Sequence, residues 1–255
     1  HSHEPYTTSA ALHLIHALVT SSEVRELLRK VTFYVVPRAN PDGGEYHLNT
    51  LSWVRSRVEV SPKPNGVIPQ DLNGDGLILN MRWEDPAGPL ALHPEDDRIL
   101  VPRRPGDSGP FYHEAVEGLI HEYDGGPLVD GVTHYDYNRN YPIRWSHTAD
   151  RARYPFEHAD LRAIGDFLLS HPNIFAGQDF HGGTPSILCP SSLPNQELTT
   201  GDLELIVEMG KLGERLTGLS VKIPEKPVGL PGSSKDFAHY TLGISWYIIE
   251  VGSMY

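Results

Sequence analysis

Residues 1–20, HSHEPYTTSAALHLIHALVT, place two histidines and a glutamate directly in front of an amphipathic segment. Apolar side chains recur there at three- and four-residue spacing, which predicts a helix over residues 5–20. Because His1 and Glu4 stand three positions apart at the entry to this helix, their side chains can face one point. Imidazole and carboxylate groups both bind zinc, so the pair indicates a metal site that still needs a third ligand.

The rest of the chain alternates between apolar strands and amphipathic helices. The run VTFYVVP (31–37) is β-branched and aromatic, which predicts a buried strand, and Asn40-Pro41-Asp42-Gly43 predicts a turn. The other elements that we expect are helices over 21–30, 159–170 and 201–217, and strands over 173–180, 186–190 and 246–251. This order predicts an α/β fold with a mixed, mostly parallel sheet and helices on both faces.

Residues 61–131 differ from their surroundings, because Pro, Gly and Asp are dense and hydrophobic periodicity is weak. A structureless loop of that length is uncommon in a compact domain, so we expect local structure here, such as a strand over 77–83, beside a functional cleft. No internal repeat or linker interrupts the chain. We therefore predict a single catalytic domain over residues 1–255, with 61–131 as an irregular insertion.

Charge and composition exclude several classes of partner. The formal net charge is −12, which argues against nucleic acid, and no apolar run approaches the ~18 residues of a membrane span. The single cysteine, Cys189, permits no intrachain disulfide and is expected to be a small buried side chain. Compartment and oligomeric state stay open.

Five motifs, taken in order, resemble the zinc carboxypeptidases of the carboxypeptidase A family, in a bacterial-type form with a long insertion. They are His1-Ser2-His3-Glu4, the strand with Asn40-Pro41-Asp42-Gly43, the segment DYNRNYP (136–142), the strand running into His181, and SSKDF (233–237) followed by a strand that ends at Glu250.

The resemblance implies a role for each matching residue. His1, Glu4 and His181 would bind one zinc ion, and Glu250 would be the general base that takes a proton from the attacking water. Asn138 and Arg139 would receive the C-terminal carboxylate of the substrate, for which the planar guanidinium group is suited. The implied substrates are the C-termini of peptides or proteins.

Three positions leave alternatives open. Arg55 follows the Asn40 turn at the family's spacing and is the preferred arginine for polarising the scissile carbonyl, with Arg82 as the alternative. Lys235 stands at the base of the family's specificity pocket, where it would attract an acidic C-terminal side chain unless it faces solvent or pairs with Asp236. His3 replaces the family's usual arginine; it would be a further substrate contact, a residue that supports the metal ligands, or a surface residue, and the surface position is favoured.

The stretch Asp71-Leu72-Asn73-Gly74-Asp75-Gly76 is similar to the first half of a calcium loop. The twelfth position from Asp71 is Arg82, where calcium needs a bidentate acid. The pattern therefore favours Asx-turns that hold a bend without metal, with calcium as the alternative.

Other functions remain compatible with the same motifs. A zinc-dependent deacylase, or a hydrolase of γ-glutamyl links in cell-wall peptides, would keep the metal and change the bond. A non-catalytic peptide-binding relative is the alternative from another class. Because strands precede and follow these motifs in the family, we expect the chain to be a core fragment, truncated at both ends.

Overall fold

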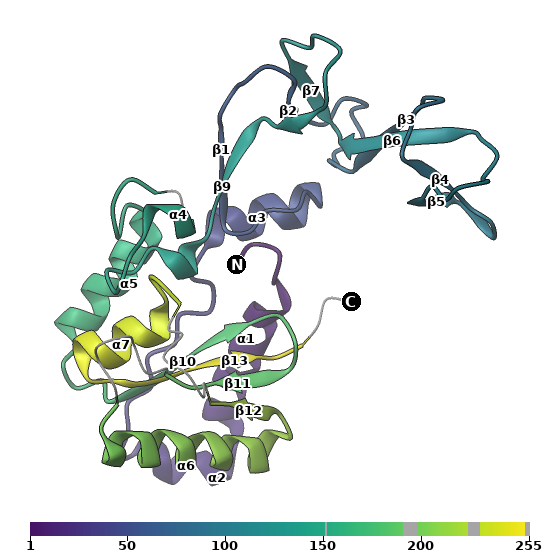
Figure 1. Ribbon diagram of the computed structural model, residues 1–255. Helices are drawn as coiled ribbons and strands as arrows, with labels where there is room; N and C mark the ends of the chain where they lie inside the picture. The colour runs from purple at the N-terminus through teal and green to yellow at the C-terminus, as the bar shows by residue number, and fades with distance from the viewer. Residues whose placement is uncertain (151, 191–197, 224–229, 253–255) are drawn as a thin grey trace. The chain divides into compact units, whose positions relative to one another are not determined.

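The computed structural model describes residues 1–150, 152–190, 198–223 and 230–252 (Figure 1). Contacts between Cα atoms divide the chain into two compact units. The first comprises residues 1–45, 54–57 and 134–255, and the second comprises 46–53 and 58–133. The predicted insertion falls within the second unit, and the single catalytic domain stays a prediction.

A four-stranded sheet in the order β10-β13-β11-β12 is the centre of the first unit. Its strands are β10 (Ala176–His181), β11 (Ser186–Leu188), β12 (Ser220–Lys222) and β13 (Ser245–Glu250). β10 runs parallel to β13, and β11 runs parallel to β12 but antiparallel to β13. Two of the three pairings are parallel, which confirms the predicted mixed, mostly parallel sheet.

Helices cover both faces of this sheet. Trp246 packs against the core cluster of Leu161 and Phe237, whereas the Tyr247 hydroxyl donates to the Ile206 carbonyl at 3.2 Å. Successive strand residues point to opposite faces, so the two clusters lie on opposite sides of β13. The helices concerned are α5 (Ala159–Ser170), α6 (Thr200–Thr217) and α7 (Ser234–Leu242). The predicted helices on both faces are confirmed.

The remaining helices of the first unit lie near its N-terminus and around the site. They are α1 (Tyr6–Thr20), α2 (Ser22–Leu28), the start of α3 (Pro41–Thr50), the 3₁₀ turn η1 (Tyr137–Arg139) and α4 (His147–Asp150). α1 packs against β10, and α7 packs against β13. In Figure 1, β10 and β13 lie side by side although they are distant in the sequence.

Two predictions in the N-terminal part are wrong. The segment 31–36 forms no strand, and Phe33, Tyr34 and Val36 are exposed, because no strand of the described residues pairs with it. The expected turn at Asn40 is the start of α3. The Asn40 side chain accepts a hydrogen bond from the Gly43 amide at 3.0 Å, and Pro41 fits the first helical position, where no amide donor is needed.

The second unit is built from short strands, as expected for 61–131. Its sheets have the orders β7-β2-β8 and β3-β6-β4-β5. The strands are β2 (Gly66–Pro69), β3 (Asn80–Glu84), β4 (Leu90–His93), β5 (Asp96–Pro102), β6 (Phe111–Val116), β7 (Gly118–His121) and β8 (Val129–Asp130). A further pair is formed by β1 (Arg57–Val60) and β9 (Val132–Tyr135). The predicted strand over 77–83 begins three residues later, at Asn80.

The bend at Asp71 is held by hydrogen bonds of its own side chain. Its carboxylate oxygens accept from the Gly74 amide at 2.7 Å and from the Gly76 amide at 2.8 Å. The Glu117 carboxylate accepts from the Leu72 amide at 2.7 Å. These bonds agree with the Asx-turn interpretation, and calcium at this loop stays an untested alternative.

Among the helices that the structure describes, none combines the length and apolar character needed to cross a bilayer.

Candidate metal centre and active site

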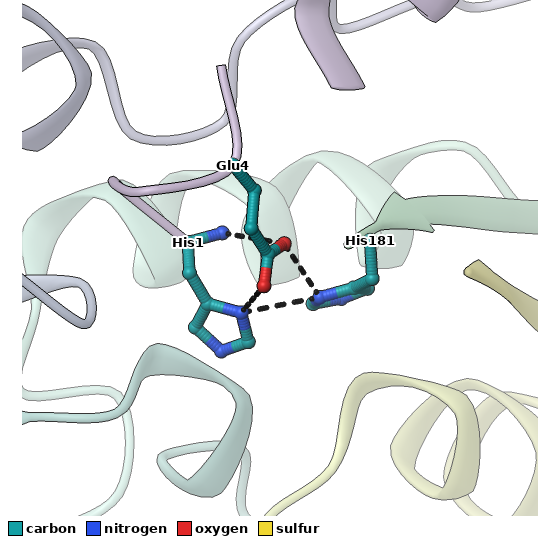
Figure 2. Close-up of side chains that lie close together, drawn as sticks. All are labelled: His1, Glu4 and His181. Atoms are coloured by element: carbon teal, nitrogen blue, oxygen red, sulfur yellow. Dashed lines mark hydrogen bonds and ion pairs between the residues drawn. The ribbon is translucent and has the colours of Figure 1, made fainter. Parts of the chain in front are cut away.

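Three side chains from distant parts of the sequence converge at one point (Figure 2). His1 Nδ1 lies 2.8 Å from Glu4 Oε1. His181 Nδ1 lies 3.3 Å from Glu4 Oε2 and 3.3 Å from His1 Nδ1. Figure 2 shows the two imidazole rings and the carboxylate pointing toward one another.

This arrangement fits a zinc ion. Tetrahedral zinc with bonds of about 2.1 Å places neighbouring ligand atoms about 3.4 Å apart. The separation of 2.8 Å between His1 Nδ1 and Glu4 Oε1 is close to that value, and so are those of 3.3 Å from His181 Nδ1 to His1 Nδ1 and to Glu4 Oε2. Two nitrogens and one carboxylate oxygen are also a donor set that catalytic zinc uses, with a fourth position left for water or substrate.

The backbone holds the first ligands rigidly against a neighbouring segment. The Ser2 amide donates to the Arg55 carbonyl at 2.8 Å, and the Ser2 hydroxyl donates to the Ser56 carbonyl at 2.6 Å. The Asn40 side-chain amide donates to the same Ser56 carbonyl at 2.6 Å. A Cβ atom at Gly43 would lie 2.2 Å from the Ser2 hydroxyl, so only glycine fits. The HSHE segment is therefore fixed before any metal binds.

Asp136 connects the metal centre to Arg55. One of its carboxylate oxygens lies 3.1 Å from His1 Nε2, and the other accepts a hydrogen bond from Arg55 Nε at 3.0 Å. A carboxylate on the far nitrogen of a metal-binding imidazole fixes the tautomer and directs the other nitrogen to the metal. Sequence reasoning assigned no role to Asp136, although it begins the quoted DYNRNYP segment.

The charges in the cluster shift its pKa values. Burial would raise the pKa of the Glu4 carboxyl, but the hydrogen bonds and charges of His1 and His181 hold it well below its usual range. Burial would likewise lower the pKa of His1, but Asp136 and Glu4 outweigh it and raise that pKa. For the Asp136 carboxyl, burial acts upward, and His1, Arg55 and Arg139 lower the pKa more strongly. The two carboxylates are therefore ionised at neutral pH and available to a cation.

Glu250 ends β13 directly beside His181, its partner in the parallel register. Its Oε2 atom is buried and has no hydrogen-bond partner among the described residues. Burial raises the pKa of the Glu250 carboxyl, and the charges of His181, Glu4, His1 and Arg55 also act on it. A carboxylate with an unpaired oxygen and a raised pKa is a suitable proton acceptor.

The side-chain oxygen of Asn138 is used in a hydrogen bond to the start of α7. Its Oδ1 accepts from the Ser234 amide, at the N-terminus of α7, at 2.8 Å. This bond assigns the orientation of the side-chain amide and leaves the two Nδ2 protons for another acceptor. The adjacent Arg139 donates from Nη1 to the Asn138 carbonyl at 2.6 Å. Neutral and cationic donors side by side suit an anionic group.

A sequence model of the zinc carboxypeptidase family matches residues 1–91, which include His1, Glu4 and Arg55. The match confirms the resemblance to zinc carboxypeptidases. No curated protein sequence matches the chain.

Two solved structures have a similar fold. The crystal structure of thrombin activatable fibrinolysis inhibitor is 17% identical with a TM-score of 0.54, and the match covers 98% of this chain and 51% of that one. The bovine form, in complex with tick carboxypeptidase inhibitor, is 16% identical with a TM-score of 0.51, and the match covers 96% and 65%. The chain thus spans about half of the first structure and less than two thirds of the second. At such identities the likeness concerns the fold.

The two arginine candidates lie in different units. Arg55 belongs to the first unit, where its Nε contacts the Asp136 that also contacts His1. Arg82 lies on β3 of the second unit and donates to the Asp97 carbonyl at 2.7 Å. Of the two, Arg55 is the one that the described contacts connect, through Asp136, to the cluster of His1, Glu4 and His181.

Lys235 and His3 are both buried. The Lys235 ammonium pairs with the adjacent Asp236 carboxylate at 2.7 Å, one of the alternatives left open for it. The prediction of a surface position for His3 is wrong, because His3 is only 8% exposed. Its Nδ1 lies 3.1 Å from the Val54 carbonyl, so the ring joins the contacts that hold the 54–56 segment.

Proposed function

We propose that this protein is a zinc-dependent metallocarboxypeptidase that hydrolyses the C-terminal peptide bond of peptides. The convergence of His1, Glu4 and His181 beside Glu250 is the observation that carries the proposal. The zinc carboxypeptidase match over residues 1–91 supports it. When bound by these ligands, one zinc ion would polarise the scissile carbonyl and acidify water.

Glu250 and Arg55 have separate roles in the proposed hydrolysis. Glu250 takes a proton from the attacking water at its carboxylate and passes that proton to the leaving amine. The guanidinium group of Arg55, held by Asp136, stabilises the negative charge that develops on the carbonyl oxygen. Neither role requires a further ionisable side chain.

Asn138 and Arg139 give the proposed enzyme its preference for chain ends. The free Nδ2 protons of Asn138 and the guanidinium group of Arg139 bind the terminal carboxylate of the substrate. An internal peptide bond offers no such anion, so these contacts position only the last peptide bond beside Glu250.

We further propose a modest preference for acidic C-terminal side chains, carried by Lys235. Because Asp236 already neutralises its charge, we expect peptides ending in Glu to exceed those ending in Leu or Lys by less than about tenfold in kcat/KM. The measurement compares three peptides that differ only in the last residue, with wild type and Lys235→Gln. Equal rates on all three peptides in the wild-type protein would contradict the preference.

Metal analysis together with a peptidase assay tests the function itself. We expect about one zinc ion per chain, release of single C-terminal residues from peptides, loss of this activity on chelation, and recovery on adding zinc. Zinc without peptidase activity, but with cleavage of N-acyl amino acids or γ-glutamyl peptides, would support a deacylase or a cell-wall hydrolase instead. Absence of bound zinc would support the non-catalytic, peptide-binding alternative.

A further inference from the structure

The hydroxyl group of Tyr6 links the start of α1 to the segment that follows β13. Tyr6 begins α1, two residues after Glu4, and its Oη donates to the Gly252 carbonyl at 3.3 Å. Gly252 lies two residues after Glu250. The first turn of α1 is therefore joined through this hydroxyl to the chain that leaves β13.

The ends of β10 and β13 are also joined to each other past their last paired residues. The Val251 amide donates to the His181 carbonyl at 2.9 Å, and the Gly183 amide donates to the Gly252 carbonyl at 2.7 Å. The Gly252 carbonyl thus accepts two hydrogen bonds, one from the end of β10 and one from Tyr6. Both lone pairs of this oxygen are used, which fixes the peptide plane.

The contacts around Tyr6 and Glu250 explain why two glycines, Gly182 and Gly183, follow His181. A Cβ atom at Gly182 would lie 1.6 Å from the Tyr6 hydroxyl, and one at Gly183 would lie 2.8 Å from Glu250 Oε2. Gly182 leaves room for the tyrosine, and Gly183 leaves room for the carboxylate. The same two residues of backbone therefore pass close to the Tyr6 hydroxyl and to the Glu250 carboxylate.

We propose that Tyr6 is a positioning residue for Glu250, which it serves by fastening the strand end that carries this glutamate to the helix that follows Glu4. This inference rests on the proposed function of Glu250 as the general base. Without the Tyr6 bond, Gly252 loses one of its two hydrogen bonds and keeps the one from the Gly183 amide, and the Glu250 carboxylate samples orientations that do not reach the attacking water. Proton transfer depends steeply on such placement.

Replacement of Tyr6 by phenylalanine tests the inference, because the ring stays and only the hydroxyl is lost. In the zinc-loaded protein we expect Tyr6→Phe to lower kcat by about three- to tenfold, the range of one net hydrogen bond, with KM and zinc content unchanged. Tyr34→Phe is the matched control. It also removes a tyrosine hydroxyl, which accepts a hydrogen bond from the Asn173 side-chain amide at 3.3 Å; Asn173 precedes the opposite end of β10. This control should keep the wild-type kcat.

A second pair of variants tests the contact over Gly182. We expect Gly182→Ala to lower kcat further than Tyr6→Phe does, because the added methyl group displaces the ring, and we expect the same substitution in a Tyr6→Ala background to cost little more. Additive losses in this cycle would overturn the inference.

The remaining outcomes separate this inference from the proposed function. A wild-type kcat in Tyr6→Phe would overturn the positioning role and leave the hydrolase standing. Loss of zinc from Tyr6→Phe with an unchanged rate per bound zinc would also overturn it, because the hydroxyl would then support the metal site and not the base. Absence of peptidase activity in the wild-type protein would overturn both.

Discussion

Glu250→Gln is expected to lower kcat for peptide hydrolysis by about a thousandfold, within the 10²- to 10⁴-fold range of general base catalysis. The amide has nearly the same size as the carboxylate but accepts no proton at its nitrogen and is a very weak base at its oxygen. Since Glu250 Oε2 has no hydrogen-bond partner among the described residues, the substitution breaks no hydrogen bond at that atom. Folding and zinc binding should therefore survive.

The measurement is kcat and KM on one peptide, with zinc content determined on the same samples. Glu208→Gln is the matched control, because it makes the same change on the exposed surface of α6, where the Glu208 carboxylate pairs with Lys211 at 3.2 Å. Activity within threefold of wild type in Glu250→Gln, with one zinc ion bound, would remove the proposed base. Loss of zinc in that variant would show instead that Glu250 supports the metal centre.

Hydrophobic periodicity in the sequence is sufficient to predict the helices that bury one face against the sheet. The helix expected over 159–170 is α5 (Ala159–Ser170), and the one expected over 201–217 is α6 (Thr200–Thr217). Their apolar residues recur with the helical period because one stripe faces the core. The strand that ends at Glu250 is predicted by its apolar run, WYII, and the expected strand over 173–180 overlaps β10.

Elements that depend on a distant partner were not predictable in this way. VTFYVVP has strong strand propensity, but a strand exists only where another chain segment completes its hydrogen bonds, and none of the described residues does so for 31–36. Asn40-Pro41 predicts a turn, but the same residues also favour the start of a helix, since Asn caps helix N-termini and Pro fits the first helical position. Helix α7 was missed because its buried positions include Ser234, Lys235 and Asp236, which hide its apolar face.

The site shows the same division. Residue type and spacing indicate His1 and Glu4 as a possible metal-binding pair, the resemblance to zinc carboxypeptidases adds His181, and the structure brings the three side chains together. The supporting contacts have no such signature. In the sequence Asp136 is one acidic residue among many, and only the fold places it between His1 and Arg55. The contact of His3 with the Val54 carbonyl likewise depends on the backbone of a distant segment, which no sequence pattern predicts.

His181→Ala is expected to abolish the stabilisation that zinc gives to the folded protein. A ligand present at a thousand times its dissociation constant stabilises the native state by about 4 kcal/mol. For a chain of this size each kcal/mol corresponds to about 2–4 °C, so zinc should raise the Tm of the wild-type protein by about 8–16 °C. Without His181 only two of the three converging donors remain, and the increase should nearly vanish.

The difference in Tm with zinc and with chelator is the quantity to compare, because it cancels the effect of the substitution on the metal-free protein. His13→Ala provides the control, since His13 is an exposed histidine on α1 outside the cluster, and its zinc-dependent increase should equal that of wild type. A full increase in His181→Ala would mean that zinc binds elsewhere. The proposal that His1, Glu4 and His181 bind one zinc ion together would then be wrong, and the proposed chemistry depends on it.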